Sequence, residues 1–339
     1  MKNHQICLSL IIRTSLSRIS ASIGLGLLTL LLGAGSALAQ GYPERFIKVV
    51  VPWPAGGSAN IAFRLVFQNL AGQFSQPVIV ENRPGANTIM GAEAVAKALP
   101  DGYTLLATSL ETLVLNPHVY QRLPYNPTSD LVPITPIARM LFVLASRPTL
   151  PGESTKSALQ LIQSQPNKFS YSSWGIGSTA HVGFEMFAQQ ADLKMLHVPY
   201  NGGPPAFSAI AANQHELMVI PLVNAIPLRK GGLAKILGIF EQSRFSAMSD
   251  IPTMKEQGYD VAFSNTLGFY APSKTPVALI QRWQTEIHQV LKQPKVQSAL
   301  EAVGMEAFSL PQADFAAYLQ AERQRWGDVI RRAGIQIQQ

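Results

Sequence analysis

Four loops rich in Gly, Ser and Thr could hold a small anion in this 339-residue chain. They are PAGGSAN (54–60), TSLET (108–112), WGIGSTAH (174–181) and YNGGPPA (200–206), and each follows a predicted strand. In open parallel sheets, ligands bind beyond the carboxyl ends of the strands, where such loops meet and helix N-termini present free N–H groups. Because a helix N-terminus carries about half a positive charge, an anion could bind there without Lys or Arg.

The first loop does not fit the known phosphate-binding motifs. A Walker loop needs Gly-Lys-Ser/Thr, but no Lys lies between Val51 and Phe67, and the G-x-G-x-x-G spacing of dinucleotide sites is also missing. Neither the first nor the third loop has the G-x-S-x-G pattern of a nucleophile elbow. A secreted hydrolase with Ser58 or Ser178 as nucleophile and His181 as base stays open, because catalytic triads are recognised by geometry rather than spacing.

The same residues also have purely structural interpretations. A Gly-Gly pair after a strand is often a turn that needs positive φ, and a Ser or Asn there is often a helix N-cap. His181 could donate to a bound anion or hydrogen-bond to the cap of its own helix. Trp53 and Trp174 could stack on a ligand or pack beneath the loops.

Strands that alternate with helices must position these loops. Residues 46–52 are a continuous apolar run, typical of a strand buried on both faces, and residues 61–70 follow with helical spacing. The alternation resumes with a helix at 154–164 and continues through two further strands to residue 240. We therefore predict an α/β fold with mostly parallel central sheets.

The length of the chain predicts two domains of about 150 residues each. We expect domain 1 to contain residues 42–140 and, after the chain returns, residues 264–339 with two C-terminal helices. Domain 2 is expected at residues 141–263. Hinges at Pro136–Ser146 and Ser264–Tyr270 would let the domains close with little repacking of either core.

Residues 1–39 have the features of a secretory signal peptide. A basic n-region, an uncharged apolar run at 19–32 and the small residues "ALA" at 37–39 precede an expected cleavage after Ala39. An uncleaved membrane anchor is the alternative, because the uncharged stretch 19–38 is long enough to span a bilayer. We predict a periplasmic protein.

The composition indicates a folded protein that has no nucleic-acid or metal chemistry. Hydrophobic residues make up 47% of the chain and charged residues 14%, far from the composition of disorder. Without the leader, 24 basic and 20 acidic residues give a net charge of +4, and no basic run suggests nucleic acid. The only cysteine, Cys7, lies in the leader, so we expect neither thiol catalysis nor a cysteine-ligated metal in the mature chain. We also expect no cofactor. Metal-ligand spacing is missing among His118, His197, His215 and His288.

Five segments are distinctive in combination. They are YPERFIKVVVPWPAGGSANIAFRL (42–65), ENRPGA (81–86), PDGYTLL (100–106), SYSSWGIGSTAHVGFEMF (170–187) and HVPYNGGPPA (197–206). In this order they resemble the Bug-type solute receptors, the substrate-binding proteins of tripartite tricarboxylate transporters. The resemblance covers essentially the whole chain after the leader.

The resemblance implies a periplasmic receptor with the type II periplasmic-binding-protein (Venus-flytrap) fold. Such a receptor closes two domains around a small organic anion and delivers it to membrane transporter subunits, without catalysis. We expect a monomer. A ligand sensor that acts on a membrane signalling protein is a further alternative, which the sequence does not separate from a transport receptor.

The resemblance also implies that three of the loops bind the ligand through backbone N–H groups and hydroxyls, directly or through water. With the neighbouring side chains, the predicted ligand-binding residues are Trp53, Gly56, Gly57, Ser58, Asn60, Ser109, Trp174, Gly177, Ser178, Thr179, His181, Tyr200, Gly202, Gly203, Pro204 and Ala206.

Three residues depart from the family pattern. Asn60 and Ile220 stand where members usually carry Asp, and Glu111 stands where they usually carry a small residue. If Glu111 faces the cleft, it would repel a second carboxylate or pair with an amine. The apolar residues Ile220, Leu222 and Val223 suggest the hypothesis that an aromatic or hydrophobic acid is preferred over a compact dicarboxylate.

Overall fold

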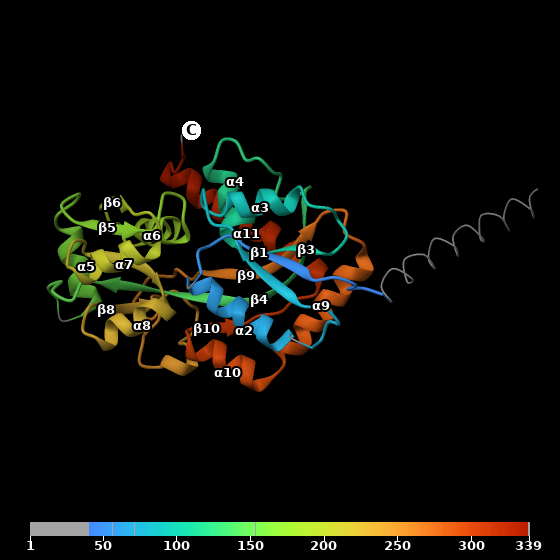
Figure 1. Ribbon diagram of the computed structural model, residues 1–339. Helices are drawn as coiled ribbons and strands as arrows, with labels where there is room; N and C mark the ends of the chain where they lie inside the picture. The colour runs from blue at the N-terminus through green and yellow to red at the C-terminus, as the bar shows by residue number, and fades with distance from the viewer. Residues whose placement is uncertain (1–40, 56, 71, 153, 338–339) are drawn as a thin grey trace, which may run out of the picture.

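The computed structural model describes residues 41–55, 57–70, 72–152 and 154–337 (Figure 1). The predicted signal peptide, its cleavage site and Gly56 of the first loop lie outside the described residues. Within the described ranges, no helix is both long enough and apolar enough to cross a bilayer.

The described strands form one continuous sheet in the order β2-β1-β3-β9-β4-β7-β5-β6, and β8 and β10 also pair with β4. Their bounds are β1 (Ile47–Val51), β2 (Val78–Asn82), β3 (Thr104–Ser109), β4 (Leu131–Ser146), β5 (Ser170–Ser173), β6 (Leu196–Pro199), β7 (Leu217–Pro221), β8 (Lys235–Ile239), β9 (Ser264–Pro272) and β10 (Met305–Ala307).

Helices connect most of these strands and cover the sheet. They are α2 (Ser58–Leu70), α3 (Ile89–Ala96), α4 (Asn116–Val119), α5 (Thr155–Gln163), α6 (Thr179–Gln190), α7 (Gly203–Ala211), α8 (Leu222–Lys230), α9 (Val277–Leu291), α10 (Pro294–Ala302) and α11 (Gln312–Ala333). A π-helical turn, η1 (Glu111–Leu115), and a 3-10 turn, η2 (Ser246–Met248), complete the set.

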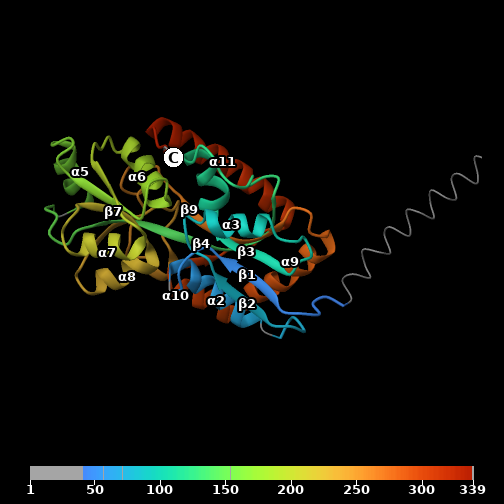
Figure 2. The same ribbon diagram turned by 45° about the horizontal axis from the view of Figure 1, so that its top comes forward.

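The 16-residue strand β4 runs from one half of the molecule into the other (Figure 2). Its residues 131–141 pair with β9, whereas residues 142–146 pair with β7. We refer to residues 42–140 and 264–337 as the first lobe, and to residues 141–263 as the second lobe.

Each lobe contains the parallel units that the sequence predicts. β1 pairs in parallel with β2 and β3 in the first lobe, and β5 pairs in parallel with β6 and β7 in the second. Every antiparallel pair of the described strands involves β4 or β9. The sheet is therefore mixed, because these two strands lie between the parallel units and run against them.

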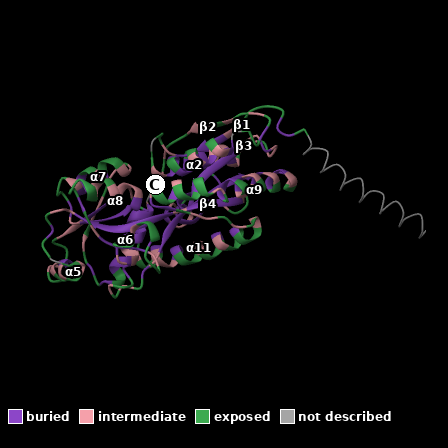
Figure 3. Ribbon diagram, turned by 90° about the horizontal axis from the view of Figure 1, so that it is seen from below, coloured by how far each residue is buried: buried purple, intermediate pink, exposed green. Residues whose placement is uncertain are grey.

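The core continues through both lobes, and the sheet lies at its centre with exposed residues on the outer helix faces (Figure 3). Successive residues of β4 point to opposite faces of the sheet. Phe142 and Leu144 accordingly join the larger buried cluster, whereas Leu141 and Val143 join a smaller cluster under α7 and α8. Trp283, which the sequence places at helical spacing, is buried in the larger cluster.

Candidate functional site

The first predicted loop brings the start of α2 against the second lobe. Ser58 is the first residue of α2, and its Oγ donates to Oδ1 of Asn224 at 2.6 Å. Asn224 lies in the first turn of α8. The N-terminal ends of a helix from each lobe therefore meet at this contact.

Asn60 holds the shape of the same loop. It is only 2% exposed; its Nδ2 donates to the Pro54 carbonyl at 2.8 Å, and its Oδ1 accepts from Asn82 Nδ2 at 3.0 Å. Asn82 also donates to the carbonyl of the half-buried Trp53 at 2.7 Å. Asn60 thus uses both its donor and its acceptor, which an Asp carboxylate could not do.

In the second loop, the predicted residue Ser109 lies inside the fold, and the side chain of Glu111 reaches the second lobe. Ser109 is fully buried, and its Oγ accepts from the Glu111 N–H at 3.3 Å. The Glu111 side chain is 3% exposed. Its Oε1 accepts from the Thr179 N–H and the Thr179 hydroxyl, both at 2.8 Å, and from Trp174 Nε1 at 3.3 Å. Glu111, which departs from the expected family pattern, therefore points into the second lobe, where its carboxylate lies at the N-terminus of α6.

The third loop is an N-cap that supports this contact. The Ser178 hydroxyl accepts from the His181 N–H at 3.3 Å and donates to the Gly175 carbonyl at 2.7 Å. Gly177 has φ +76°, and a Cβ there would lie 2.5 Å from Val119 of the first lobe. Only glycine allows both this conformation and this close approach.

His181 makes the cap contact that the sequence left as one of two possibilities. The Gly177 N–H donates to His181 Nδ1 at 3.1 Å, and the imidazole ring stacks on His197 with centroids 3.8 Å apart. Burial, with the neighbouring His197, lowers the pKa of His181 to about 3, and burial lowers the pKa of His197 to about 4. Both rings are therefore neutral at physiological pH, and the proton of His181 is on Nε2.

The fourth loop lies beside the third, because the Gly202 N–H donates to the Trp174 carbonyl at 3.3 Å. Gly202 has φ +97°, and α7 begins at Gly203. The Tyr200 hydroxyl is 2.7 Å from His215 Nε2. Of the two remaining predicted residues of this loop, Pro204 is exposed and Ala206 is fully buried.

The structure thus places Ser58 in one contact between the lobes and Trp174 and Thr179 in another, and each contact includes an asparagine that was not predicted. These are Asn224, which contacts Ser58, and Asn265, whose Nδ2 donates to Thr179 Oγ1 at 3.2 Å. Asn224 follows a predicted strand, so the rule that selected the four loops could have selected it as well. Asn265 lies at the start of β9, where the sequence pattern carries no comparable signal.

The apolar residues Ile220, near the end of β7, and Leu222, at the start of α8, do not form an open wall, and Val223 is half-buried against the larger core cluster. Ile220 and Leu222 are fully buried in the smaller core cluster. Leu222 also packs against the first lobe, since a Cβ at Gly304 would lie 2.9 Å from its Cγ. These positions therefore give no support to the hypothesis of an aromatic ligand.

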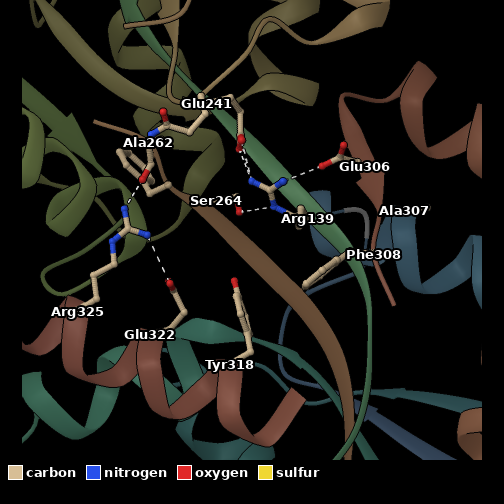
Figure 4. Close-up of a pocket in the computed structure, with 12 residues that line it drawn as sticks. Arg139, Glu241, Ala262, Ser264, Glu306, Ala307, Phe308, Tyr318, Glu322 and Arg325 are labelled. Carbon is tan, nitrogen blue, oxygen red and sulfur yellow. Dashed lines mark hydrogen bonds and ion pairs between the residues drawn. The ribbon is translucent and has the colours of Figure 1, made fainter. Parts of the chain in front are cut away.

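A pocket of about 630 Å³ lies on a different face, beside the crossing strands β4 and β9 (Figure 4). Arg139 of β4 donates through Nη2 to both carboxylate oxygens of Glu241, at 2.8 and 2.7 Å. Its Nη1 donates to Glu306 at 2.8 Å and its Nε to Ser264 at 3.1 Å. Arg139 consequently joins the second lobe, through Glu241, to β10 of the first lobe.

Burial of the Glu241 carboxyl raises its pKa, although the Arg139 guanidinium opposes this change. A second pocket, of about 600 Å³, lies near Tyr120 and Arg323. Neither pocket is lined by a predicted site residue. In the described part of the chain, no three His, Cys, Asp or Glu side chains are grouped so that they could hold a metal ion.

Comparisons with known proteins agree over most of the chain. A family model described as "Tripartite tricarboxylate transporter family receptor" matches residues 62–335. A UPF0065 protein of Bordetella pertussis is 32% identical over 312 residues, which cover 92% of this chain and 96% of that protein. The protein BugT of the same species is 29% identical, with 95% and 99% of the two chains covered.

Solved structures show the same fold. A structure described as a periplasmic transporter is 32% identical and superimposes with a TM-score of 0.80, covering 87% of this chain and 99% of the other. Rpa4515 of R. palustris, solved with adipate, is 27% identical with a TM-score of 0.82 and covers 87% and 100%. MatC of Rhodopseudomonas palustris, solved with malate, is 27% identical with a TM-score of 0.76 and covers 85% and 100%.

Proposed function

Because this chain belongs to the tripartite tricarboxylate transporter receptor family, we propose that it captures a small carboxylate between its two lobes and delivers it to the membrane subunits of such a transporter. The predicted resemblance to Bug-type receptors is confirmed, and so is the α/β periplasmic-binding-protein fold. Adipate in Rpa4515 and malate in MatC support a carboxylate as the ligand class.

One observation of this structure carries the proposal. The N-terminus of α6 already holds a carboxylate, that of Glu111, through a backbone N–H and a hydroxyl, each at 2.8 Å. This is the chemistry that the predicted loops were expected to perform, since charge-assisted hydrogen bonds at a helix N-terminus need no cation. The start of α2 at Ser58 faces the same boundary from the first lobe.

We propose that the lobes move as domains with the predicted boundaries, 42–140 with 264–339 and 141–263. The change of partners along β4 after Leu141 supports a hinge within Pro136–Ser146. The second hinge would be Ser264–Tyr270, where β9 begins beside β4. Bending at two adjacent strands would separate Ser58 from Asn224 while each parallel unit stays intact.

The proposed receptor has no catalytic role. The Ser58 hydroxyl donates to the Asn224 side chain, and the Ser178 hydroxyl donates to the Gly175 carbonyl. Among the described residues, neither hydroxyl is hydrogen-bonded to an imidazole, and His181 Nδ1 accepts from a backbone N–H. A nucleophile needs a base within hydrogen-bonding reach, so this geometry favours binding over hydrolysis.

A ligand screen on protein purified from the periplasm of an expression host tests these proposals. Aliphatic and aromatic carboxylates that bind should raise the Tm by several degrees, and mass spectrometry should find the ligand unchanged afterwards. An N-terminus at Gln40 would establish cleavage after Ala39, and light scattering would test the proposed monomer. The proposal fails if no carboxylate stabilises the protein or if a product forms.

Transport and sensing differ in the cell rather than in the binding site. Uptake of the ligand found in the screen should be lost in a strain without this protein and restored by its gene. Unchanged uptake, with loss of a transcriptional response to the same ligand, would favour the sensor.

A further inference from the structure

Glu111 reaches from the first lobe into a set of donors in the second lobe. Its Oε1 accepts from the Thr179 N–H and hydroxyl at 2.8 Å and from Trp174 Nε1 at 3.3 Å. The Thr179 hydroxyl oxygen accepts from Asn265 Nδ2 at 3.2 Å, so its proton is directed at Glu111. Asn265 is oriented in turn by the Leu110 N–H, which donates to its Oδ1 at 3.1 Å. These hydrogen bonds run in series from the Leu110 N–H through Asn265 and Thr179, and the last one is donated to the Glu111 carboxylate.

These are the surroundings that a bound carboxylate requires. Glu111 is 3% exposed, and within the described residues it takes part in no ion pair. A buried carboxylate without a cation must be stabilised by donors and by local partial charge. The N-terminus of the 12-residue helix α6 supplies both.

We infer that Glu111 is a specificity-determining residue, which fills the anion position at α6 with the protein's own carboxylate and so selects ligands with one carboxylate over dicarboxylates. The inference rests on the proposed carboxylate-binding function and names the ligand class within it. With the α6 position occupied, the inference leaves the carboxylate of the ligand to the other helix N-terminus at the boundary between the lobes, that of α2 at Ser58, and a second carboxylate would have to bind beside Glu111. A second carboxylate there meets a fixed like charge, whereas an apolar, hydroxyl or ammonium group does not.

Chemical rescue tests the occupancy of the α6 position without knowledge of the natural ligand. Glu111→Gly, made in the chain purified from the periplasm, removes the carboxylate and leaves its donors facing the vacated space. Acetate at about 0.1 M should then raise the Tm of the variant by about 3 °C relative to chloride at equal ionic strength. Wild type should show a smaller acetate-specific rise than the variant, because Glu111 already occupies the α6 position and only the proposed ligand position can take acetate.

A matched control comes from the same helix. Glu185→Gln also removes one negative charge, six residues along α6, where the Glu185 carboxylate accepts from the Tyr171 hydroxyl. This variant should respond to acetate as wild type does. An equal acetate response in Glu111→Gly and wild type would overturn the inference.

Ligand selectivity is tested with Glu111→Gln, which keeps the length of the side chain and an acceptor oxygen but removes the charge. Calorimetry compares a dicarboxylate with the monocarboxylate and the ω-amino acid of the same chain length, chosen from the best hit of the screen; for six carbons these are adipate, hexanoate and 6-aminohexanoate. Wild type should bind the two monocarboxylates about tenfold tighter than the dicarboxylate, and Glu111→Gln should reduce this ratio about fivefold. A wild type that prefers the dicarboxylate, with the same preference in Glu111→Gln, contradicts the inference.

The two proposals fail in different ways. If no carboxylate binds in the screen, the proposed function is wrong, and the acetate experiment still decides whether Glu111 fills an anion position. If carboxylates bind but neither variant differs from wild type, the receptor function stands and the role of Glu111 is wrong.

Discussion

Two groups of contacts join the lobes, and they differ in kind. We call the contacts of Ser58 and Glu111 the cleft side, and those of Arg139 beside β4 and β9 the crossing side. On the cleft side, side-chain hydrogen bonds connect Ser58 to Asn224 and Glu111 to Thr179. On the side of the crossing strands, Arg139 lies between the carboxylates of Glu241 and Glu306 (Figure 4). The cleft side thus contains a buried carboxylate without a cation, and the crossing side contains a guanidinium with two carboxylates.

This difference suits a receptor that must open on one side only. The cleft contacts are few: the neutral hydrogen bond at Ser58 is worth about 1 kcal/mol and those to the Glu111 carboxylate about 1.5–3 kcal/mol each, and these groups can bond to water when the cleft opens. Breaking a partly buried ion pair leaves an uncompensated charge and costs about 3–5 kcal/mol. We therefore expect the crossing side to keep its contacts while the cleft opens.

The largest effect is expected from Arg139→Met. The variant leaves Glu241, whose side chain is 13% exposed, without its cation. The protein should lose about 3 kcal/mol of stability, and its Tm should fall by about 5 °C in calorimetry. Glu306→Gln is the matched control, because this partner of the same guanidinium is 51% exposed and should contribute less than about 1 kcal/mol. Equal losses in the two variants would contradict the proposed importance of burial.

Asn60→Asp should disturb the cleft side, although the resemblance to the family leads us to expect Asp at this position. The carboxylate could not donate to the Pro54 carbonyl and would lie against that oxygen in a buried position. We expect a loss of about 2 kcal/mol in denaturant unfolding, together with weaker ligand binding. Asn69→Asp is a control, because Asn69 donates in the same way to the Leu65 carbonyl but lies further along α2. If Asn60→Asp is as stable as wild type, the loop does not depend on this donor.

Mild acid should lower the stability of the protein through His181, which hydrogen-bonds to the third loop. The folded-state pKa of His181, about 3, lies below its ordinary value of 6.5, so below pH 6.5 the unfolded chain binds a proton that the folded chain does not. The contribution of neutral His181 to the free energy of unfolding is complete above pH 6.5. It falls by roughly 1.4 kcal/mol per pH unit below pH 6.5, so about 2 kcal/mol is lost at pH 5.

Chemical unfolding between pH 7 and pH 5 measures this slope. His181→Gln should reduce it, because the variant has no imidazole to protonate at this position. An identical slope in wild type and variant would assign the pH dependence to other groups.

The smallest effect is expected from Ser58→Ala, which removes one hydrogen bond between the lobes. A loss of about 1 kcal/mol from the closed state should weaken ligand binding about fivefold in calorimetry and leave the Tm nearly unchanged. Ser129→Ala, at an exposed serine bonded to Asp130, should leave affinity as in wild type. Unchanged affinity in Ser58→Ala would show that the Ser58–Asn224 hydrogen bond is not made in the closed, liganded state.

Local features of the fold were predictable because short stretches of sequence determine them. The apolar run at β1 and the N-cap at Ser178 follow from periodicity and capping, which act over a few residues. The mixed pairing around β4 was not predictable from the βαβ rhythm, because β4 and β9 pair across about 130 residues of intervening chain.

For the site, the sequence alone determined which loops are available and their chemistry: glycines that tolerate close approach, hydroxyls that cap helices, and a family pattern that indicates a carboxylate receptor. Only the tertiary structure decided that Asn224 meets Ser58, that Ala206 and Ile220 are buried, and that the Glu111 carboxylate lies at the start of α6. The physical reason is distance along the chain. Loop type depends on neighbouring residues, whereas these contacts join residues 68 or more positions apart and depend on how the lobes pack.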